Sequence, residues 1–142
     1  ASDEEVRHAA RVAQAEDFVL AMPDGYQSAV AQGGTNLSGG QKQRLSIARA
    51  VVRRPAVYVF DDSFSALDVA TDARVRAALR DETREATVIV VAQRITTAMA
   101  ADRIVVLDAG AVVGIGTHQE LLGSCGVYQE IVASQLTREE VA

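Results

Sequence analysis

Short apolar runs that alternate with a helical pattern after Pro55 constrain the fold of this chain more than any other feature. The run 57–60 is rich in β-formers, and the run 87–92 repeats it after a helical pattern over 69–84, which Asp68 is placed to cap. Two further runs of the same kind follow: 103–107 and 111–115. Because these runs are continuously apolar, we expect strands of a sheet that is covered on both faces. The order strand–helix–strand predicts an α/β layered core.

The first 55 residues carry helical patterns and no strand pattern. A capping box that begins at Ser2 predicts a helix over 3–21, and a second helix is expected over 38–53. Near the other end, a capping box at Thr117 and an amphipathic pattern over 126–136 predict two more helices. The chain is therefore expected to divide into a helical part and an α/β part: 1–55 and 56–142.

The composition is that of one folded domain and argues against several other classes. The chain has 142 residues, of which 49% are hydrophobic and 23% charged, as in ordinary globular proteins. A net charge of −5 argues against a nucleic-acid-binding surface. No apolar stretch approaches the roughly 20 residues of a membrane-spanning helix, and the first residues lack the order of a secretory signal. The single cysteine, Cys125, excludes an internal disulfide and is expected to be a buried bystander.

The run Ser38-Gly39-Gly40-Gln41 stands directly before a predicted helix. Two glycines at a helix N-terminus expose backbone N–H groups and the positive end of the helix dipole, which suits a phosphate group. Ser38 and Gln41 add side chains that can donate hydrogen bonds. Taken alone, the same run could also be a plain helix cap without a ligand.

The wider string 36–50 resembles the signature motif and signature helix of ABC transporter nucleotide-binding domains nearly residue for residue. The tripeptide Asp24-Gly25-Tyr26 is similar to the lead-in of exporter-type members. The resemblance implies the C-terminal portion of such a domain: a partial P-loop NTPase (RecA-like) core with a helical signature subdomain. It also implies that four residues bind ATP held by another subunit: Ser38, Gly39, Gly40 and Gln41.

Two acidic residues, Asp61 and Asp62, follow the first predicted strand, where the sheets of α/β proteins bind ligands. In the family that the chain resembles, the first acid is the Walker B residue. Asp61 is thereby expected to help hold Mg²⁺, directly or through water, beside the phosphates of ATP. The second acid is usually a glutamate that polarises the attacking water, and Asp62 is one methylene shorter. The next motif is similar to the family's D-loop at the dimer interface: Ser65, Ala66, Leu67 and Asp68.

Gln93 stands after the second strand, at the position where similar domains carry a histidine that contacts the γ-phosphate. Glutamine can donate a hydrogen bond there but cannot carry a proton. Neither histidine of the chain is expected to replace it, because His118 fits local packing at a helix start and His8 fits a solvated helix surface. Gln32 occupies the place of an acid in the loop through which exporters touch their membrane domain.

The changes at Asp62 and Gln93, together with an intact signature motif, predict that two ATP sites of the assembly have different roles. General acid–base assistance contributes roughly 10²–10⁴ in rate, so these two changes predict slow hydrolysis in the chain's own ATP site. Its signature would complete the competent site of a second, non-identical nucleotide-binding domain. We expect a transmembrane domain fused upstream, a location on the cytoplasmic face of the membrane, and no nucleic-acid partner.

The sequence contains no Gly-x-x-x-x-Gly-Lys-Ser/Thr phosphate loop. The resemblance therefore covers nearly all of the chain but only part of a complete domain, so we expect a fragment that lacks the phosphate-loop half. In related folds the phosphate-loop strand lies between the strand before Gln93 and the one that starts near Arg103. Its absence predicts unpaired sheet edges and a piece that neither hydrolyses ATP nor binds it tightly.

Three alternatives stay open at this point. An active homodimeric ABC ATPase would turn over ATP without a second kind of subunit. A non-transport ABC ATPase acting on DNA or ribosomes would lack upstream membrane spans. A non-catalytic interaction module would keep the fold, but its Ser38 would not approach a partner's phosphate loop.

Overall fold

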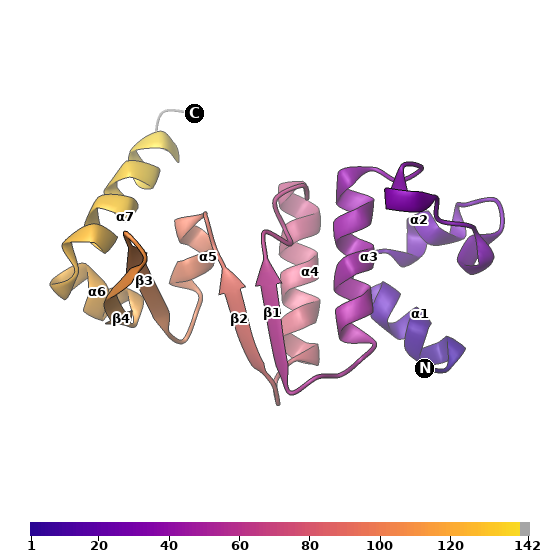
Figure 1. The fold of residues 1–142 in the computed structure, drawn as a ribbon, viewed down its shortest axis with the longest axis horizontal. Coiled ribbons are helices and arrows are strands. Elements are labelled where there is room, and N and C mark those ends of the chain that lie inside the picture. The colour runs from indigo at the N-terminus through magenta and orange to yellow at the C-terminus, as the bar shows by residue number, and fades with distance from the viewer. Residues whose placement is uncertain (140–142) are drawn as a thin grey trace. The chain divides into compact units, whose positions relative to one another are not determined.

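The computed structural model describes residues 1–139, and these residues form two compact units that meet between Val91 and Ala92 in the sequence (Figure 1). The first unit contains α1 (Asp3–Val12), α2 (Glu16–Leu20), two 3-10 turns (Gly25–Gln27 and Gln32–Gly34), α3 (Gly39–Val51), β1 (Val57–Asp61), α4 (Val69–Glu82) and β2 (Thr87–Val91). The second contains α5 (Ile95–Met99), β3 (Ile104–Asp108), β4 (Ala111–Gly116), α6 (His118–Ser124) and α7 (Gly126–Glu139). The mixed α/β class is as predicted.

The helix predicted over 3–21 is wrong, because the chain breaks between α1 and α2. Gln14 adopts a left-handed backbone conformation with φ 54°. The cause is a tertiary contact with α3: the Arg44 Nη1 donates a hydrogen bond of 2.7 Å to the Gln14 carbonyl. The same guanidinium lies 4.7 Å from the ring centroid of Phe18 in α2, where a cation–π attraction adds to the hydrogen bond. The break therefore orients α2 against α3.

β1 and β2 form a parallel pair that runs in register from Val57 opposite Thr87 to Asp61 opposite Val91. Parallel strands need a crossover connection, and α4 supplies it. One face of the pair is covered by helices, and the core beneath it joins α1, α3, β1 and α4. Its buried members include Ala9, Ala10, Ala13, Ile47, Val51, Tyr58, Phe60, Phe64, Leu67, Val75 and Leu79. The sequence predicted a boundary between a helical part, 1–55, and an α/β part, 56–142. That boundary would separate two subdomains of a complete domain, and it stays a prediction.

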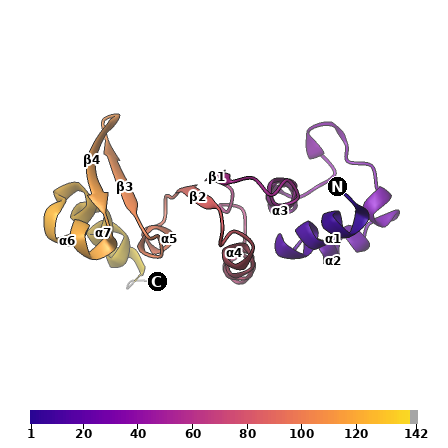
Figure 2. The same cartoon turned by 90° about the horizontal axis from the view of Figure 1, so that it is seen from below.

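The opposite face of the β1–β2 pair is exposed, although the continuous apolar pattern predicted a sheet covered on both faces. Val57 and Val59 alternate with the buried Tyr58 and Phe60 of β1, and Ile89 lies opposite Val59 in the register of β2. Together with Val91 of β2, these residues are 50–64% exposed. In Figure 2, α4 lies on one side of the pair, and no element of residues 1–91 covers the other. The prediction fails for the described chain because the pair carries only one helical layer.

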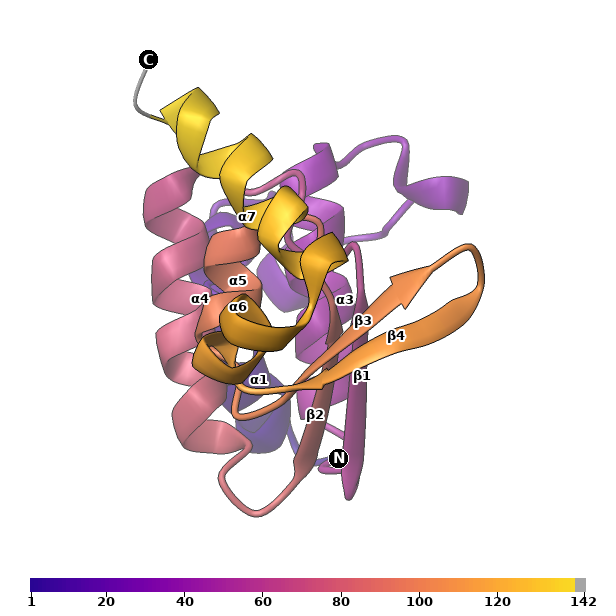
Figure 3. The same cartoon turned by 90° about the vertical axis from the view of Figure 1, so that its left-hand side faces the viewer.

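In the second unit, β3 and β4 form an antiparallel hairpin whose turn residues, Ala109 and Gly110, both have positive φ. This is the geometry of a two-residue turn that matches the twist of the strands. Helices α6 and α7 pack against the hairpin (Figure 3). Their common core consists of Ile95, Ile104, Val106, Leu121, Cys125, Tyr128 and Val132. The short helix α5 was not predicted.

Both histidines make specific contacts. His118 Nδ1 lies 2.8 Å from the Tyr128 hydroxyl, which confirms the expected local packing at the start of α6. His8 differs from the expectation of a purely solvated residue: its Nε2 lies 2.7 Å from Glu82 Oε2, and its side chain is 42% exposed. This pair joins α1 to α4, a contact across 74 residues of sequence that no local pattern reveals.

Candidate nucleotide-binding site

The N-terminal turn of α3, residues 38–41 including the cap, is held by a complete capping box. Ser38 Oγ accepts a hydrogen bond of 3.2 Å from the Gln41 N–H, and Gln41 Oε1 accepts one of 2.8 Å from the Ser38 N–H. The helix therefore starts where the sequence predicts it. The box also fixes the side chains of Ser38 and Gln41, which leaves the Ser38 hydroxyl hydrogen and the Gln41 amide nitrogen for other partners.

The capping box leaves two backbone donors at the first turn of a 13-residue helix. In the part of the chain that the structure describes, no hydrogen bond occupies the N–H groups of Gly39 and Gly40. Ser38 and Gly39 are exposed, and no side chain at Gly39 or Gly40 shields the backbone. Two adjacent donors at the positive end of a helix can bind a phosphate oxygen.

The loop 65–68 packs directly on this turn. A Cβ at Gly40 would come within 3.0 Å of the Ala66 carbonyl oxygen, and one at Gly39 would lie 3.5 Å from the Ala66 side chain. The glycines therefore allow a close approach that alanine at position 40 would strain. Turn and loop together border a hollow of about 400 Å³, lined by Ser38, Gly39, Gly40, Arg44, Ala66, Leu67, Asp68 and Thr71.

A side-chain amide on α3 fastens the same loop. Gln43 Nε2 donates hydrogen bonds of 2.9 Å to the Asp62 carbonyl and to Ser65 Oγ, while its Oε1 accepts one of 2.9 Å from the Ala66 N–H. Ser65 Oγ in turn lies 3.2 Å from the Asp62 carbonyl. The predicted signature and D-loop residues are thus brought together by a residue that the sequence reasoning did not single out.

The two candidate acids lie at the carboxyl end of β1. Asp61 is the last residue of the strand and Asp62 follows it, and both are exposed. Asp62 has a left-handed backbone with φ 49°, which is uncommon for a residue other than glycine. Among the described residues no group of three or more His, Cys, Asp or Glu side chains could hold a metal ion unaided. One carboxylate beside nucleotide phosphates nevertheless fits Mg²⁺, which is usually bound by one or two carboxylates together with phosphates and water.

Asp68 caps α4, as the sequence predicted. Its Oδ1 accepts a hydrogen bond of 2.9 Å from the Thr71 N–H. Hydrogen bonds from the Thr71 side chain, and then from its backbone, hold the pKa of Asp68 below its ordinary value of 3.8. The carboxylate is therefore ionised at neutral pH and lies beside the positive end of the helix, where negative charge is favourable.

Gln93 belongs to the second unit and is exposed. Its backbone is clamped by α7: Gln135 Nε2 donates a hydrogen bond of 2.8 Å to the Gln93 carbonyl, and Gln135 Oε1 accepts one of 2.7 Å from the Ile95 N–H. Since Gln135 lies 42 residues from Gln93, this support could not be read from the sequence. The side chain of Gln93 is left at the surface.

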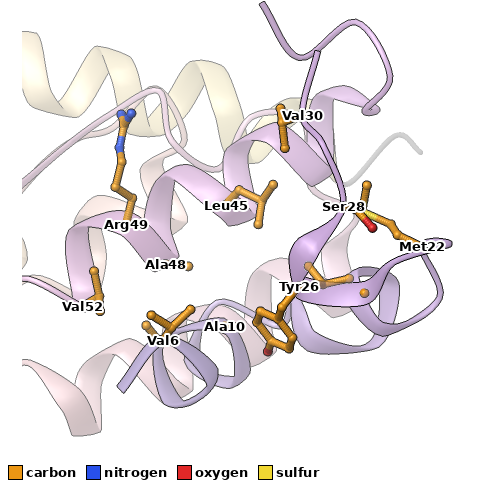
Figure 4. Close-up of a pocket in the computed structure, with 13 residues that line it drawn as sticks. Val6, Ala10, Met22, Tyr26, Ser28, Val30, Leu45, Ala48, Arg49 and Val52 are labelled. Atoms are coloured by element: carbon orange, nitrogen blue, oxygen red, sulfur yellow. The ribbon is translucent and has the colours of Figure 1, made fainter. Parts of the chain in front are cut away.

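A separate apolar pocket of about 240 Å³ lies between α1, α3 and the loop after α2 (Figure 4). Val6 and Ala10 line it from α1, Leu45 from α3, Val52 from the C-cap of α3, and Tyr26 from the loop. It lies on the side of α3 that faces α1 and is distinct from the hollow at the helix start. Over the described residues, no helix is both long and apolar enough to cross a bilayer.

Comparison with known proteins agrees with this geometry. A family model described as ABC transporter matches residues 2–65. An uncharacterized ABC transporter ATP-binding protein of Mycobacterium tuberculosis is 58% identical over 134 residues, which are 94% of this chain and 23% of that protein. A mitochondrial potassium channel ATP-binding subunit of Rattus norvegicus is 48% identical over 135 residues, 95% of this chain and 19% of that protein. The solved structure of a bacterial Atm1-family ABC exporter with ATP bound matches with a TM-score of 0.90 and 39% identity, covering 95% of this chain and 24% of the other.

Fold and site therefore define an ATP-binding domain of the ABC class, and the chain belongs to the ABC transporter family. Its fold is part of a P-loop NTPase core that matches the nucleotide-binding domain of an exporter. The chain spans about a quarter of the length of the relatives it matches, between 19% and 24% in the three given above.

Proposed function

We propose that this chain is part of the ATP-binding subunit of an exporter-type ABC transporter and lends its signature turn to ATP held by a second subunit. The subunit would act on the cytoplasmic face of a membrane, and ATP hydrolysis in the complete assembly would drive transport. The transported substrate is set by membrane helices outside this sequence.

The observation that carries the proposal is the pair of N–H groups on Gly39 and Gly40, which make no hydrogen bond to any described residue. They lie at the positive end of α3, beside a hollow that the 65–68 loop also lines. This arrangement supports binding of a terminal phosphate from outside the chain. The phosphate loop that holds this ATP would belong to the second ATP-binding domain.

In the full-length subunit, the ATP site that contains Asp61, Asp62 and Gln93 would bind ATP and cleave it slowly. Asp61 would contact Mg²⁺ directly or through water, and the metal would neutralise charge on the phosphates. Asp62 is exposed at the strand end but has a shorter side chain than glutamate, and Gln93 cannot take up a proton. Both changes support a non-identical partner whose own site retains the hydrolytic residues.

The apolar pocket between α1 and α3 is our candidate contact for a transmembrane domain. It opens beside the loop that leads to Gln32, the position where exporters carry an acid that touches their membrane domain. Because the pocket is apolar and Gln32 is uncharged, we propose that packing of apolar side chains, rather than an ion pair, couples the two parts.

A disulfide-crosslinking experiment tests the main proposal. In the full-length assembly, Ser38→Cys would be paired with a cysteine in the partner's phosphate loop, and crosslinking would be measured with and without Mg²⁺ and ATP. We expect a crosslink that depends on ATP. Ser134→Cys, at an exposed position on α7, is the control and should not respond to ATP. An assembly that shows no ATP-dependent crosslink at position 38 would contradict the proposal.

Turnover separates the paired arrangement from an active homodimer. The full-length protein is purified without any second ATP-binding subunit, and ATP hydrolysis is measured. We expect slow turnover that rises when the partner is added. Fast turnover by the protein alone would favour the homodimeric alternative.

A further inference from the structure

We propose that Gln43 is a positioning residue that couples the Asp62 backbone to the signature turn at residues 38–41. The proposal rests on the function proposed above, since it assigns Asp62 to the chain's own ATP site and the signature turn to the partner's. Gln43 itself would touch neither ATP nor Mg²⁺. It would transmit the conformation of one site to the other.

The geometry of the Gln43 side chain supports this role. Its amide nitrogen donates to two acceptors, the Asp62 carbonyl and Ser65 Oγ, and its oxygen accepts from the Ala66 N–H, all at 2.9 Å. A primary amide is the side chain that can donate twice and accept at the same time. Glutamate has the same shape but can only accept when ionised, so it would keep the Ala66 contact and lose the other two.

The hydrogen bonds of Gln43 are expected to stabilise an unusual backbone conformation at Asp62. With φ at 49°, Asp62 occupies a region that residues with a side chain rarely adopt. Such conformations persist where the surroundings over-determine them. The Asp62 carbonyl accepts from both Gln43 Nε2 and Ser65 Oγ, and these two contacts hold the residue in its unusual conformation. Its carboxylate direction therefore depends on Gln43.

The other end of the connection is the signature turn. Gln43 lies on α3, five residues after the cap Ser38. The Ala66 carbonyl oxygen lies so near Gly40 of the same helix that a Cβ there would come within 3.0 Å of it. The Gln43 side chain, the 65–68 loop and the start of α3 are thus in mutual contact. Close-packed contacts transmit small displacements. A shift of Asp62 when its own nucleotide changes would move the loop against Gly39 and Gly40.

The test compares Gln43→Glu with the parent in the full-length assembly. Turnover, the KM for ATP and the ATP-dependent crosslink from Ser38→Cys are measured in both. A displacement of about 1 Å can cost on the order of 10²-fold in rate, so we expect kcat to fall at least about tenfold. The KM should stay within about twofold, because Gln43 makes no contact with ATP in the proposed arrangement. The crosslink should weaken by a similar factor to kcat.

Two further variants provide the controls. Gln119→Glu makes the same chemical change at an exposed position on α6 and should leave all three measurements unchanged. Ser65→Ala removes one of the two groups that bind the Asp62 carbonyl and should lower kcat less than Gln43→Glu. In the double variant, the effects should be less than additive, because both side chains act on the same carbonyl.

The outcomes distinguish this inference from the proposed function. Suppose that the parent forms the crosslink and that Gln43→Glu has the same kcat per folded assembly as the parent. The positioning role of Gln43 is then wrong, while the proposed function is still supported. A rise in KM with unchanged kcat would also overturn it, since that pattern indicates lost binding of ATP. If the parent itself forms no ATP-dependent crosslink, the proposed function fails first.

Discussion

The side-chain amide of Gln135 bridges the backbone on both sides of Arg94, with its nitrogen 2.8 Å from the Gln93 carbonyl and its oxygen 2.7 Å from the Ile95 nitrogen. Gln43 makes the same kind of clamp in the first unit, where it binds the Asp62 carbonyl and the Ala66 N–H. In both units, a glutamine on a helix binds the loop that follows a strand. Each of these loops contains a candidate catalytic residue, Asp62 or Gln93. Loops that must position side chains need such support, because they lack ladder hydrogen bonds of their own.

Replacing Gln135 by leucine should destabilise the protein. The substitution leaves the Ile95 N–H without its acceptor, and an unsatisfied buried donor costs about 1–3 kcal/mol. Urea unfolding of the complete domain measures the change. Gln119→Leu, at an exposed position, is the control and should stay within about 0.5 kcal/mol of the parent. Equal stability of Gln135→Leu and the parent would show that water replaces the clamp without loss.

If the proposed function is correct, glutamate at position 62 and histidine at position 93 should raise ATP hydrolysis in the site of the full-length subunit that contains these two positions. Asp62→Glu lengthens the carboxylate by one methylene, and Gln93→His supplies a group that can carry a proton. If these positions act as general base and phosphate contact, the double variant should gain about 10² or more in single-site turnover. The measurement uses the full-length assembly with the partner's site inactivated. Asp62→Asn is the control, and it should show no gain.

The helix starts were predictable because their signals are local. Ser38, Asp68 and Thr117 each cap a helix in the structure, and each was identified from a capping residue followed by a periodic pattern. The four apolar runs likewise became β1 to β4 with boundaries shifted by one residue or less. A capping residue and the turn it caps lie within three or four positions of each other, so the sequence contains the whole interaction.

The features that sequence reasoning missed depend on distant residues. The break at Gln14 is set by Arg44, 30 residues away, and the clamp of Gln43 acts across 19 to 23 residues. Neither Arg44 nor Gln43 carries a local signal for these contacts, because both fit an ordinary exposed helix position by type. The uncovered β1–β2 face was also missed, since an apolar pattern indicates what a strand can bury and not which segment covers it.

The cap at Asp68 predicts a pH-dependent contribution to stability. The hydrogen bonds from Thr71 lower the pKa of Asp68 from its ordinary value of 3.8, so the folded state favours the ionised form. This contribution is fully present above the unfolded pKa and is lost as the pH falls through the lower folded pKa. We expect the stability difference between the parent and Asp68→Asn to be constant from pH 7 to about 5 and to shrink below about 4.

Urea unfolding of the complete domain at a series of pH values measures that difference. Asparagine is the matched variant because it keeps a capping oxygen and removes only the charge. An NMR titration of the Asp68 side chain should independently give a midpoint below 3.8. A midpoint above 3.8 would contradict the expectation that the helix cap favours the ionised form of Asp68.

Two glycines of the second unit should respond to alanine with opposite signs. A Cβ at Gly114 on β4 would lie 2.9 Å from Leu121 Cδ2 and 3.0 Å from Cys125 Sγ, and both neighbours are buried. Overpacking of this kind costs about 1–3 kcal/mol, so Gly114→Ala should lower the free energy of unfolding. Gly123 lies in α6 with open space around the position of a Cβ, so Gly123→Ala should raise stability by roughly 0.5–1 kcal/mol. Thermal and urea unfolding of both variants measure the signs, and a shared sign would show that β4 and α6 do not pack as described.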